Sequence, residues 1–390
     1  MTTDFITPNT LKTRAAKLWQ QGKLHKAWLN NESLFPLILN IPTPSASELL
    51  HQFSNIQSAI SILKQDSIKH GYILTYKTIN HQKLGTQTLP HTIVFEQEQD
   101  LLRYLNKTTE FILFKQICDI TLNQYPDLHS WFVRYPFKIT EFSDVWLQLL
   151  KVCAYFIKHP LPDCYIRQLD IEGIDSKFIE SHKAILTELL DIILPETARF
   201  PEITGLANHG FERRYGLRYD LPLCRFRILD KNLAIHGLSD LTITIPEFKI
   251  LNLNIKTVFI VENKITGLSF PDFPNAIVIF ALGYSVDVLA DIPMLKNATL
   301  YYWGDLDTHG FAILSRLRSY YPNTISFLMD EHTLKQFSYL SGTESKSLET
   351  IPDYLTSEEL AVFFHLKNTS LRLEQERISF KALQDYLNKL

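Results

Sequence analysis

The chain has 390 residues, of which 45% are hydrophobic and 21% charged, a balance typical of a folded protein with a large core and two or three domains. The formal net charge of −3 gives no global sign of nucleic-acid binding, although it does not exclude local basic surfaces. The four cysteines are scattered without a CxxC pair, which disfavours disulfides and zinc clusters and favours reduced thiols.

Neither a secretion signal nor a membrane span is predicted. The segment MTTDFITPNTLK lacks a basic stretch followed by an apolar core, and the strongest apolar run, AIVIFALG, is too short to cross a bilayer. We therefore expect a cytoplasmic protein with no membrane contact.

Residues 1 to about 70 are predicted to be helical. In TPNTLKTRAAKLWQQGKLHKAWL, apolar residues recur at helical spacing, and the basic residues between them face solvent or, alternatively, phosphate or an acidic partner. Alternation in GYILTYKTINHQKLGTQTLPHTIVFE predicts a β meander, and helical periodicity returns from Gln99 to Lys158.

A basic region follows a boundary that is marked by two prolines and a glycine in KHPLPDCYIRQLDIEGIDSKF. We expect a helix from Lys177 to Leu194, then a short helix and the strand LCRFRIL, an order that resembles a small winged helix. Between Gly205 and Lys231, six Lys/Arg residues against three Asp/Glu residues give a local charge of +3.

From about Leu251 the chain alternates strands and helices. Three apolar runs, IKTVFIVEN, NAIVIFALG and ATLYYWGDLD, lack strict alternation, as expected of strands that are covered on both faces. A helix is predicted from Thr308 to Tyr320, and a fourth strand, TISFLMD, follows it. This order predicts an open parallel sheet in an α/β domain.

Acidic residues follow two of these strands: Glu262 ends the first, and Asp305 and Asp307 end the third. Ligands gather beyond the carboxyl ends of parallel strands, so three carboxylates converge if the strands are neighbours. Their mutual repulsion calls for a cation, and hard carboxylate oxygens suit Mg²⁺ or Mn²⁺. Alternatively, Asp307 caps the helix that begins near Thr308, and Asp305 is a turn residue.

A glutamate after one strand and a D-x-D motif after a later one resemble the TOPRIM domain of topoisomerases, primases and related nucleases. Five longer segments make the chain similar to the JetD subunit of Wadjet plasmid-defence systems: RQLDIEGIDSKFIESH, FERRYGLR, VENKITGLSFP, YYWGDLDTHGFAILSRLRSYYPNTISFLMDEHTL and LRLEQERI. The likeness extends from about residue 165 to the C-terminus and is weaker before it. It implies an α/β and α+β multidomain fold, with a mostly helical N-terminal arm that binds partners (1–165), a winged-helix (CAP-like) domain (166–245) and a TOPRIM domain with a parallel sheet (246–390).

The resemblance also implies a function, that of a DNA endonuclease cutting closed circular plasmid DNA as a homodimer. Its implied partners are double-stranded DNA and the SMC-like motor, kleisin and kite-type subunits of a defence complex. By position, Glu262, Asp305 and Asp307 are the metal-binding catalytic acids. Similar topoisomerase subunits attack DNA with a tyrosine in an arginine–acid–x–Tyr–Tyr motif, which this sequence lacks. We therefore expect a metal-activated water as the nucleophile.

Other residues are expected to support the site. Lys264 is expected to meet a phosphate oxygen and His309 to orient water or contact DNA, the alternatives being an exposed lysine and a residue in the first turn of a helix. LRLEQERI is expected to form a surface ion-pair helix, with Glu374 or Glu376 alternatively acting as second-metal or supporting groups. The residues expected to contact the DNA backbone, which position DNA without reading its sequence, are Arg213, Arg214, Arg218, Arg225 and Arg227.

The sequence has features of two other classes of protein. A non-catalytic DNA-binding or adaptor subunit with a structural metal site stays open. A HAD-like phosphatase is suggested by DLDT, which fits a D-x-D-x-T motif. That fold needs its aspartates on the first strand, with a lysine and an acidic pair well downstream, whereas DLDT lies near the end of this chain, so the phosphatase is disfavoured.

Overall fold

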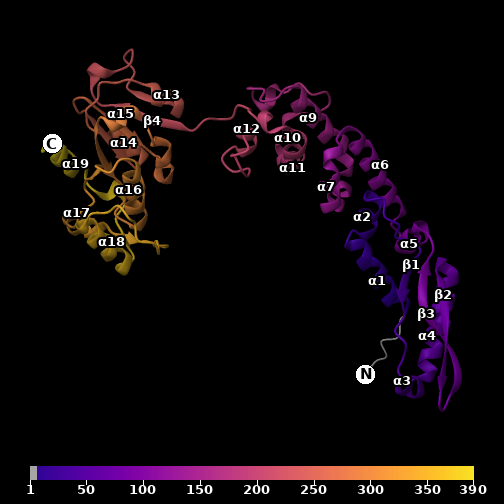
Figure 1. Cartoon of the computed structure of the whole chain (residues 1–390). Coiled ribbons are helices and arrows are strands. Elements are labelled where there is room, and N and C mark those ends of the chain that lie inside the picture. Colours follow the sequence, from indigo (N-terminus) through magenta and orange to yellow (C-terminus); the bar gives the residue numbers. More distant parts are fainter. Residues whose placement is uncertain (1–6) are drawn as a thin grey trace. The chain divides into compact units, whose positions relative to one another are not determined.

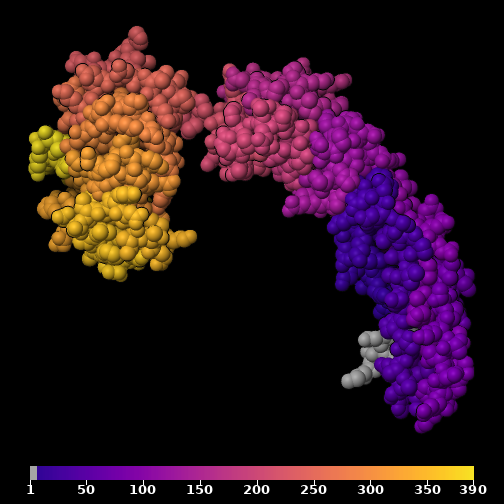
Figure 2. Space-filling model, in the orientation of Figure 1, coloured from indigo at the N-terminus to yellow at the C-terminus, as the bar shows by residue number. Residues whose placement is uncertain are grey.

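The computed structural model describes residues 7–390, which divide into two compact units, with the boundary in the chain between Tyr219 and Asp220 (Figure 1). Each unit has its own hydrophobic core, and side chains fill the spaces between its elements (Figure 2). The expectations that concern residues 1–6, a helical start and the lack of a secretion signal, lie outside the described residues.

The first unit combines helices with a small antiparallel sheet of order β1-β3-β2. Its strands are β1 (Leu37–Asn40), β2 (Ile73–His81) and β3 (Gly85–Phe95). The two long strands lie where alternation predicted a meander. β1 interrupts the segment that was expected to be helical to about residue 70, because LILN pairs with β3, a contact distant in sequence that local periodicity does not reveal.

Helices make up most of this unit and carry the predicted helical stretch between residues 99 and 158. The α-helices are α1 (Pro8–Gln20), α2 (Lys23–Leu29), α3 (Ala46–His51), α4 (Phe53–His70), α5 (Glu98–Leu105), α6 (Thr108–Gln124), α7 (His129–Arg134), α8 (Pro136–Glu141), α9 (Trp146–Lys158), α10 (Ser176–Ser181), α11 (Lys183–Ile193) and α12 (Gly210–Arg214). Short 3₁₀ helices are η1 (Pro126–Leu128), η2 (Ser143–Val145), η3 (Ile166–Gln168) and η4 (Glu196–Ala198). Across the described residues, no helix has the length and apolar character needed to cross a membrane.

The second unit is built around a six-stranded mixed sheet of order β5-β4-β7-β6-β8-β9. Its strands are β4 (Leu223–Ile228), β5 (Asp240–Thr244), β6 (Thr257–Val261), β7 (Ala276–Phe280), β8 (Thr299–Trp303) and β9 (Ile325–Ser326). Strands β7, β6, β8 and β9 are parallel neighbours, while β4 and β5 are antiparallel additions at one edge. Every residue of β7 is buried, as the uniformly apolar sequence predicted. The expected parallel sheet is thus four strands of a larger mixed sheet.

Helices and a two-stranded ladder surround this sheet. They are α13 (Ile245–Ile250), α14 (Lys264–Ser269), α15 (Pro293–Lys296), α16 (Thr308–Tyr320), α17 (Glu331–Gln336), α18 (Ser357–Thr369) and α19 (Phe380–Leu387), with 3₁₀ helices η5 (Lys231–Leu233), η6 (Gly283–Leu289), η7 (Ser338–Leu340) and η8 (Gln375–Arg377). The ladder pairs β10 (Gly342–Thr343) with β11 (Leu371–Arg372). The helix predicted from Thr308 to Tyr320 is confirmed.

The segment LRLEQERI is not the surface helix that its charges predicted. It forms β11 and then η8, and Leu373 between them exchanges two backbone hydrogen bonds with Leu306, of 2.9 and 3.1 Å. Because Leu306 and Leu373 are far apart in the sequence, local periodicity does not reveal this pairing. The pairing replaces the helix that the local pattern predicted, and it places the segment beside the D-x-D motif.

The strand that was expected in a winged-helix domain belongs to the sheet of the second unit. β4 is hydrogen-bonded to β5 and β7, and Cys224, Phe226 and Ile228 along it are buried in that unit's core. The boundary between Tyr219 and Asp220 falls inside the range 166–245. A division into 1–165, 166–245 and 246–390, and the winged-helix and TOPRIM assignments, stay predictions.

Candidate metal centre

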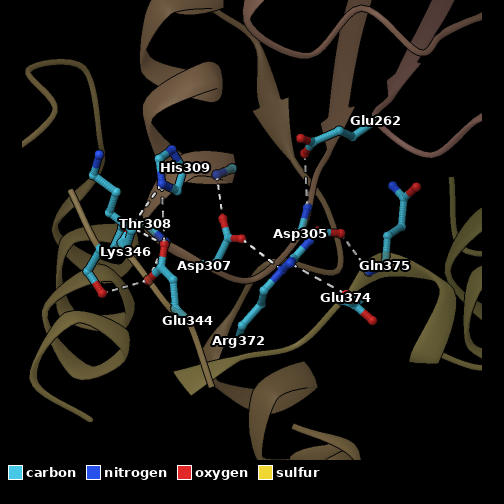
Figure 3. Close-up of polar contacts among 12 residues, drawn as sticks. Glu262, Asp305, Asp307, Thr308, His309, Glu344, Lys346, Arg372, Glu374 and Gln375 are labelled. Carbon is cyan, nitrogen blue, oxygen red and sulfur yellow. Dashed lines mark hydrogen bonds and ion pairs between the residues drawn. The ribbon is translucent and has the colours of Figure 1, made fainter. Parts of the chain in front are cut away.

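The carboxyl ends of β6 and β8 bring the candidate acids together (Figure 3). These strands are adjacent and parallel, with Val261 opposite Trp303, so the residues that follow them lie at one edge of the sheet. Glu262 follows β6 directly, and its Oε2 accepts a hydrogen bond of 3.2 Å from the backbone N–H of Asp305. Two segments about forty residues apart therefore meet at this point.

Gln375, which lies in η8, joins the two strand ends. Its Nε2 donates to the carbonyl of Trp303 at 2.6 Å, and its Oε1 accepts the N–H of Asn263 at 3.0 Å. Its own backbone N–H donates to Asp305 Oδ1 at 2.8 Å. Gln375 is fully buried, so these bonds are shielded from water and hold Glu262 and Asp305 in register. No local pattern in the sequence indicated a role for this residue.

Gly304 permits close approach between the strand end and Glu262. A Cβ at this position would lie 2.6 Å from the Tyr302 hydroxyl and 2.9 Å from Glu262 Oε2. Any side chain here would displace the glutamate. The Tyr302 hydroxyl is buried beside Glu262, and burial, followed by the charge of Glu262, raises the pKa of this tyrosine.

Asp307 is the N-cap of α16, as the alternative interpretation predicted. Its Oδ1 accepts the N–H of Gly310 at 2.7 Å. Capping uses one oxygen only, and Oδ2 lies 3.2 Å from Nε of Arg372. The cap and a role in cation binding are therefore compatible.

Arg372, the last residue of β11, lies between the carboxylates (Figure 3). Its Nη2 donates to Asp305 Oδ2 at 2.7 Å, and its Nη1 lies 3.5 Å from Glu374 Oε1. The hydrogen bond to Asp305 is the main reason why the pKa of Arg372 is raised. Among residues 7–390, no three His, Cys, Asp or Glu side chains are arranged as a ready metal-binding group. The positive charge between the two aspartates is that of the guanidinium.

The acids carry an excess of negative charge. Burial, followed by the charge of Asp305, raises the pKa of Glu262 to about 7. Burial also raises the pKa of Asp307, and the charges of Asp305 and Glu344 raise it further. The hydrogen bond from the N–H of Gly310 lowers it and only partly offsets these effects. Carboxylate oxygens are the donors that Mg²⁺ and Mn²⁺ prefer, so these side chains suit a divalent cation by chemistry, although as they stand in the described structure they do not form a ready cluster and metal binding stays a prediction.

Two family models match the chain. Residues 216–387 match the model described as Wadjet protein JetD, C-terminal, and residues 8–191 match one described as an uncharacterized N-terminal family conserved in bacteria (DUF3322). The chain belongs to the Wadjet JetD family. No curated protein matches it. The JetD match contains the whole candidate centre, from Glu262 to Gln375.

His309 follows the D-x-D motif, and both of its ring nitrogens are engaged. Nε2 lies 2.9 Å from the carbonyl of Lys346, and Nδ1 lies 2.5 Å from the hydroxyl of Tyr284. The carbonyl can only accept, so Nε2 donates and Nδ1 accepts the tyrosine proton. Lys264 is the exposed first residue of α14. Contact of His309 or Lys264 with water or DNA stays a prediction.

Glu344 is a buried acid that the sequence analysis missed. It accepts hydrogen bonds from the hydroxyl of Thr308 at 2.5 Å and from Ser347 at 3.0 Å. It thereby ties the loop after β10 to the first turn of α16. Glu344 is far from the D-x-D motif in the sequence, so no local pattern could connect it with the site.

Three of the arginines expected to contact DNA lie in the first unit. Arg213 and Arg218 are exposed, and Arg218 forms a two-point ion pair with Asp163 at 2.8 and 3.0 Å. Arg214 is only 7% exposed, and its Nε donates to Asp191 at 2.6 Å. Arg213 and Arg218 are therefore accessible to the phosphates of a DNA backbone, whereas the buried Arg214 is not.

The other two arginines lie on β4 in the second unit. Arg225 forms a two-point ion pair with Asp240 at 2.8 and 3.2 Å. Arg227 donates to the backbone carbonyls of Leu268 and Phe270, which fixes the end of α14. Arg227 thus supports the fold next to the site, and DNA contact by any of the five arginines stays a prediction.

The raised pKa of Glu262 predicts a pH-dependent stability in metal-free protein. Because the folded state binds this proton more tightly than the unfolded state, the free energy of unfolding should fall as the pH rises from the unfolded value of 4.5 to about 7. We expect Glu262 to account for a fall of about 1–3 kcal/mol between pH 5 and pH 8, which Glu262→Gln removes. Urea denaturation in EDTA at both pH values measures this, and identical pH dependence in wild type and variant would contradict it.

Proposed function

We propose that this chain is the nuclease subunit of a Wadjet complex, a divalent-cation-dependent endonuclease that cuts closed circular plasmid DNA. The observation that carries the proposal is the meeting of Glu262, Asp305 and Asp307 at the carboxyl ends of adjacent parallel strands, the edge at which such sheets bind ligands. Membership of the JetD family supports a place in a Wadjet defence system with SMC-like partner subunits. Two copies acting as a homodimer would bring one site to each DNA strand.

Glu262, Asp305 and Asp307 would hold Mg²⁺ or Mn²⁺. Such an ion activates water and stabilises negative charge on the scissile phosphate. The chain's own residues position this chemistry: Gln375 fixes the strand ends, and Gly304 admits Glu262 close to the backbone. These contacts fix the backbone on which Glu262 and Asp305 stand, so the two carboxylates start from defined positions.

Water is the proposed nucleophile. In the basic segment, Tyr215 is fully buried, and its hydroxyl donates to Asp191 at 2.7 Å, so DNA has no access to it. Tyr284 is the tyrosine to exclude by experiment, because it is 46% exposed and its hydroxyl donates a hydrogen bond to Nδ1 of His309 beside the acids.

The test combines the full chain with its SMC-like motor complex, ATP, Mg²⁺ and closed circular plasmid. We expect linear DNA whose ends carry no covalently attached protein, and no product in EDTA. Protein attached to the ends, lost in Tyr284→Phe, would refute the water mechanism. Absence of cutting by the complete, ATP-hydrolysing complex would favour the adaptor function, in which the same carboxylates would hold a structural metal.

A further inference from the structure

We propose that Arg372 is an internal cation that competes with the divalent ion for Asp305 and Asp307, and so sets the metal concentration at which the site fills. The inference rests on the proposed metal site. It assigns to Arg372 a role that DNA cutting itself does not require.

The competition follows from how the oxygens of the two aspartates are used. Oδ1 of Asp305 accepts the N–H of Gln375 at 2.8 Å, and Oδ1 of Asp307 accepts the N–H of Gly310 at 2.7 Å. The two remaining oxygens, Oδ2 in each case, contact the Arg372 guanidinium at 2.7 and 3.2 Å. The oxygens left for a metal ion are therefore the ones that Arg372 holds.

Charge explains why the Arg372 guanidinium lies between the two aspartates. Asp305 and Asp307 lie close to Glu262, and such carboxylates repel one another unless a positive charge compensates them. The guanidinium supplies one charge to both aspartates from a single fork. A divalent ion on the same oxygens would repel the guanidinium, so the two cations exclude each other.

The surroundings of Arg372 allow its side chain to move away from the two aspartates. Its side chain is 40% exposed, and it belongs to a two-residue strand. Its buried Nε makes no regular hydrogen bond within the described residues, although it lies 3.2 Å from Asp307, and its Nη1 is 3.5 Å from Glu374. The guanidinium is held by charge more than by packing, and a stronger cation can displace it.

Arg377 offers a matched control in the same segment. Its side chain is 46% exposed, against 40% for Arg372, and it pairs with the same Glu374 at 3.1 Å. Its Nη1 donates to the carbonyl of Leu340 at 2.8 Å. Within the described residues, the acid that Arg377 pairs with is Glu374, and it does not pair with Asp305 or Asp307. Arg377→Gln therefore removes the same charge as Arg372→Gln without freeing the oxygens of the two aspartates.

The experiment titrates Mn²⁺ into the full chain without DNA and measures its dissociation constant by calorimetry. We expect Arg372→Gln to bind Mn²⁺ about 10-fold more tightly than wild type or better, and Arg377→Gln to stay within about 2-fold. Asp305→Asn should lose binding. In EDTA, Arg372→Gln should also melt at a lower temperature than wild type, and Mn²⁺ should raise that temperature more than it does for wild type.

The possible results distinguish failure of the competition by Arg372 from failure of the proposed metal site. Unchanged or weaker binding in Arg372→Gln, with binding still lost in Asp305→Asn, would overturn the competition and leave the metal site standing. No Mn²⁺ binding in wild type or in Arg372→Gln would overturn the metal site and the competition together. If Arg372→Gln fails to fold, Arg372→Lys serves, because a single ammonium keeps the charge but cannot reproduce the two-point fork of the guanidinium, and it should give an intermediate gain. No gain in Arg372→Lys would overturn the competition.

Discussion

Glu262→Gln and Asp305→Asn are each expected to lower cleavage of closed circular plasmid by the complete complex about 100-fold or more. Each change removes one negative oxygen ligand and keeps the size of the side chain, so the loss reports on the proposed cation rather than on packing. Glu262 lies at the end of β6, and Asp305 follows β8. Initial rates of plasmid linearisation, with ATP and Mg²⁺ present, measure the effect.

The matched control for this loss is Glu331→Gln. Glu331 is a glutamate on α17 of the same unit, its side chain is 70% exposed, and it pairs with Lys335. We expect its cleavage rate to equal that of the wild type. Unchanged cutting by both site variants, or equal loss in the control, would remove the basis for assigning the acids.

Arg318→Met is expected to lower the free energy of unfolding of the second unit by about 3–5 kcal/mol. Arg318 and Glu359 form a buried two-point ion pair, with side chains 9% and 8% exposed, and Arg318 Nε also donates to the carbonyl of Thr324 at 2.9 Å. Removing the arginine leaves a buried carboxylate without its cation. Urea denaturation of the full chain at pH 7 measures the loss.

The same ion pair predicts how the loss depends on pH. Burial tends to raise the pKa of Glu359, but hydrogen bonds from Arg318 and Ser326 outweigh it and hold the pKa below its ordinary value of 4.5. The stability that the pair provides is therefore present at neutral pH and is lost as the pH falls below about 4.5 through the folded pKa. The difference between wild type and Arg318→Met should shrink in acid.

Lys335→Met provides the comparison, because it breaks the exposed pair with Glu331 in the same unit. We expect no measurable change in the free energy of unfolding, because water and salt screen an exposed pair. A similar loss in Lys335→Met and Arg318→Met at pH 7 would show that burial does not decide the contribution of these pairs.

Local patterns in the sequence predicted the centre of the second unit. The uniformly apolar β6 and β7 and the helix α16 were recognisable because burial on both faces and helical spacing leave clear marks on a sequence. β4 was assigned to a different domain because its alternating apolar residues fit any half-buried strand, and only its pairing with β7 reveals its sheet.

The same limit applies to the candidate site. Glu262, Asp305 and Asp307 were found because they end strands, a local property. Arg372 and Gln375 reach the site because Leu373 pairs with Leu306. No local sequence pattern predicts a pairing between residues so far apart in the chain. The charged surroundings of Arg372 and Gln375 instead suggested a helix, which the pairing prevents.

The most direct measurement of the central claim is anomalous diffraction from crystals of the full chain soaked in Mn²⁺. We predict an anomalous peak in contact with Glu262, Asp305 and Asp307, with the Arg372 guanidinium moved away from the Oδ2 atoms of the two aspartates that it contacts here. A Mn²⁺-saturated crystal with no peak at these carboxylates, and with Arg372 still between the two aspartates, would contradict the account.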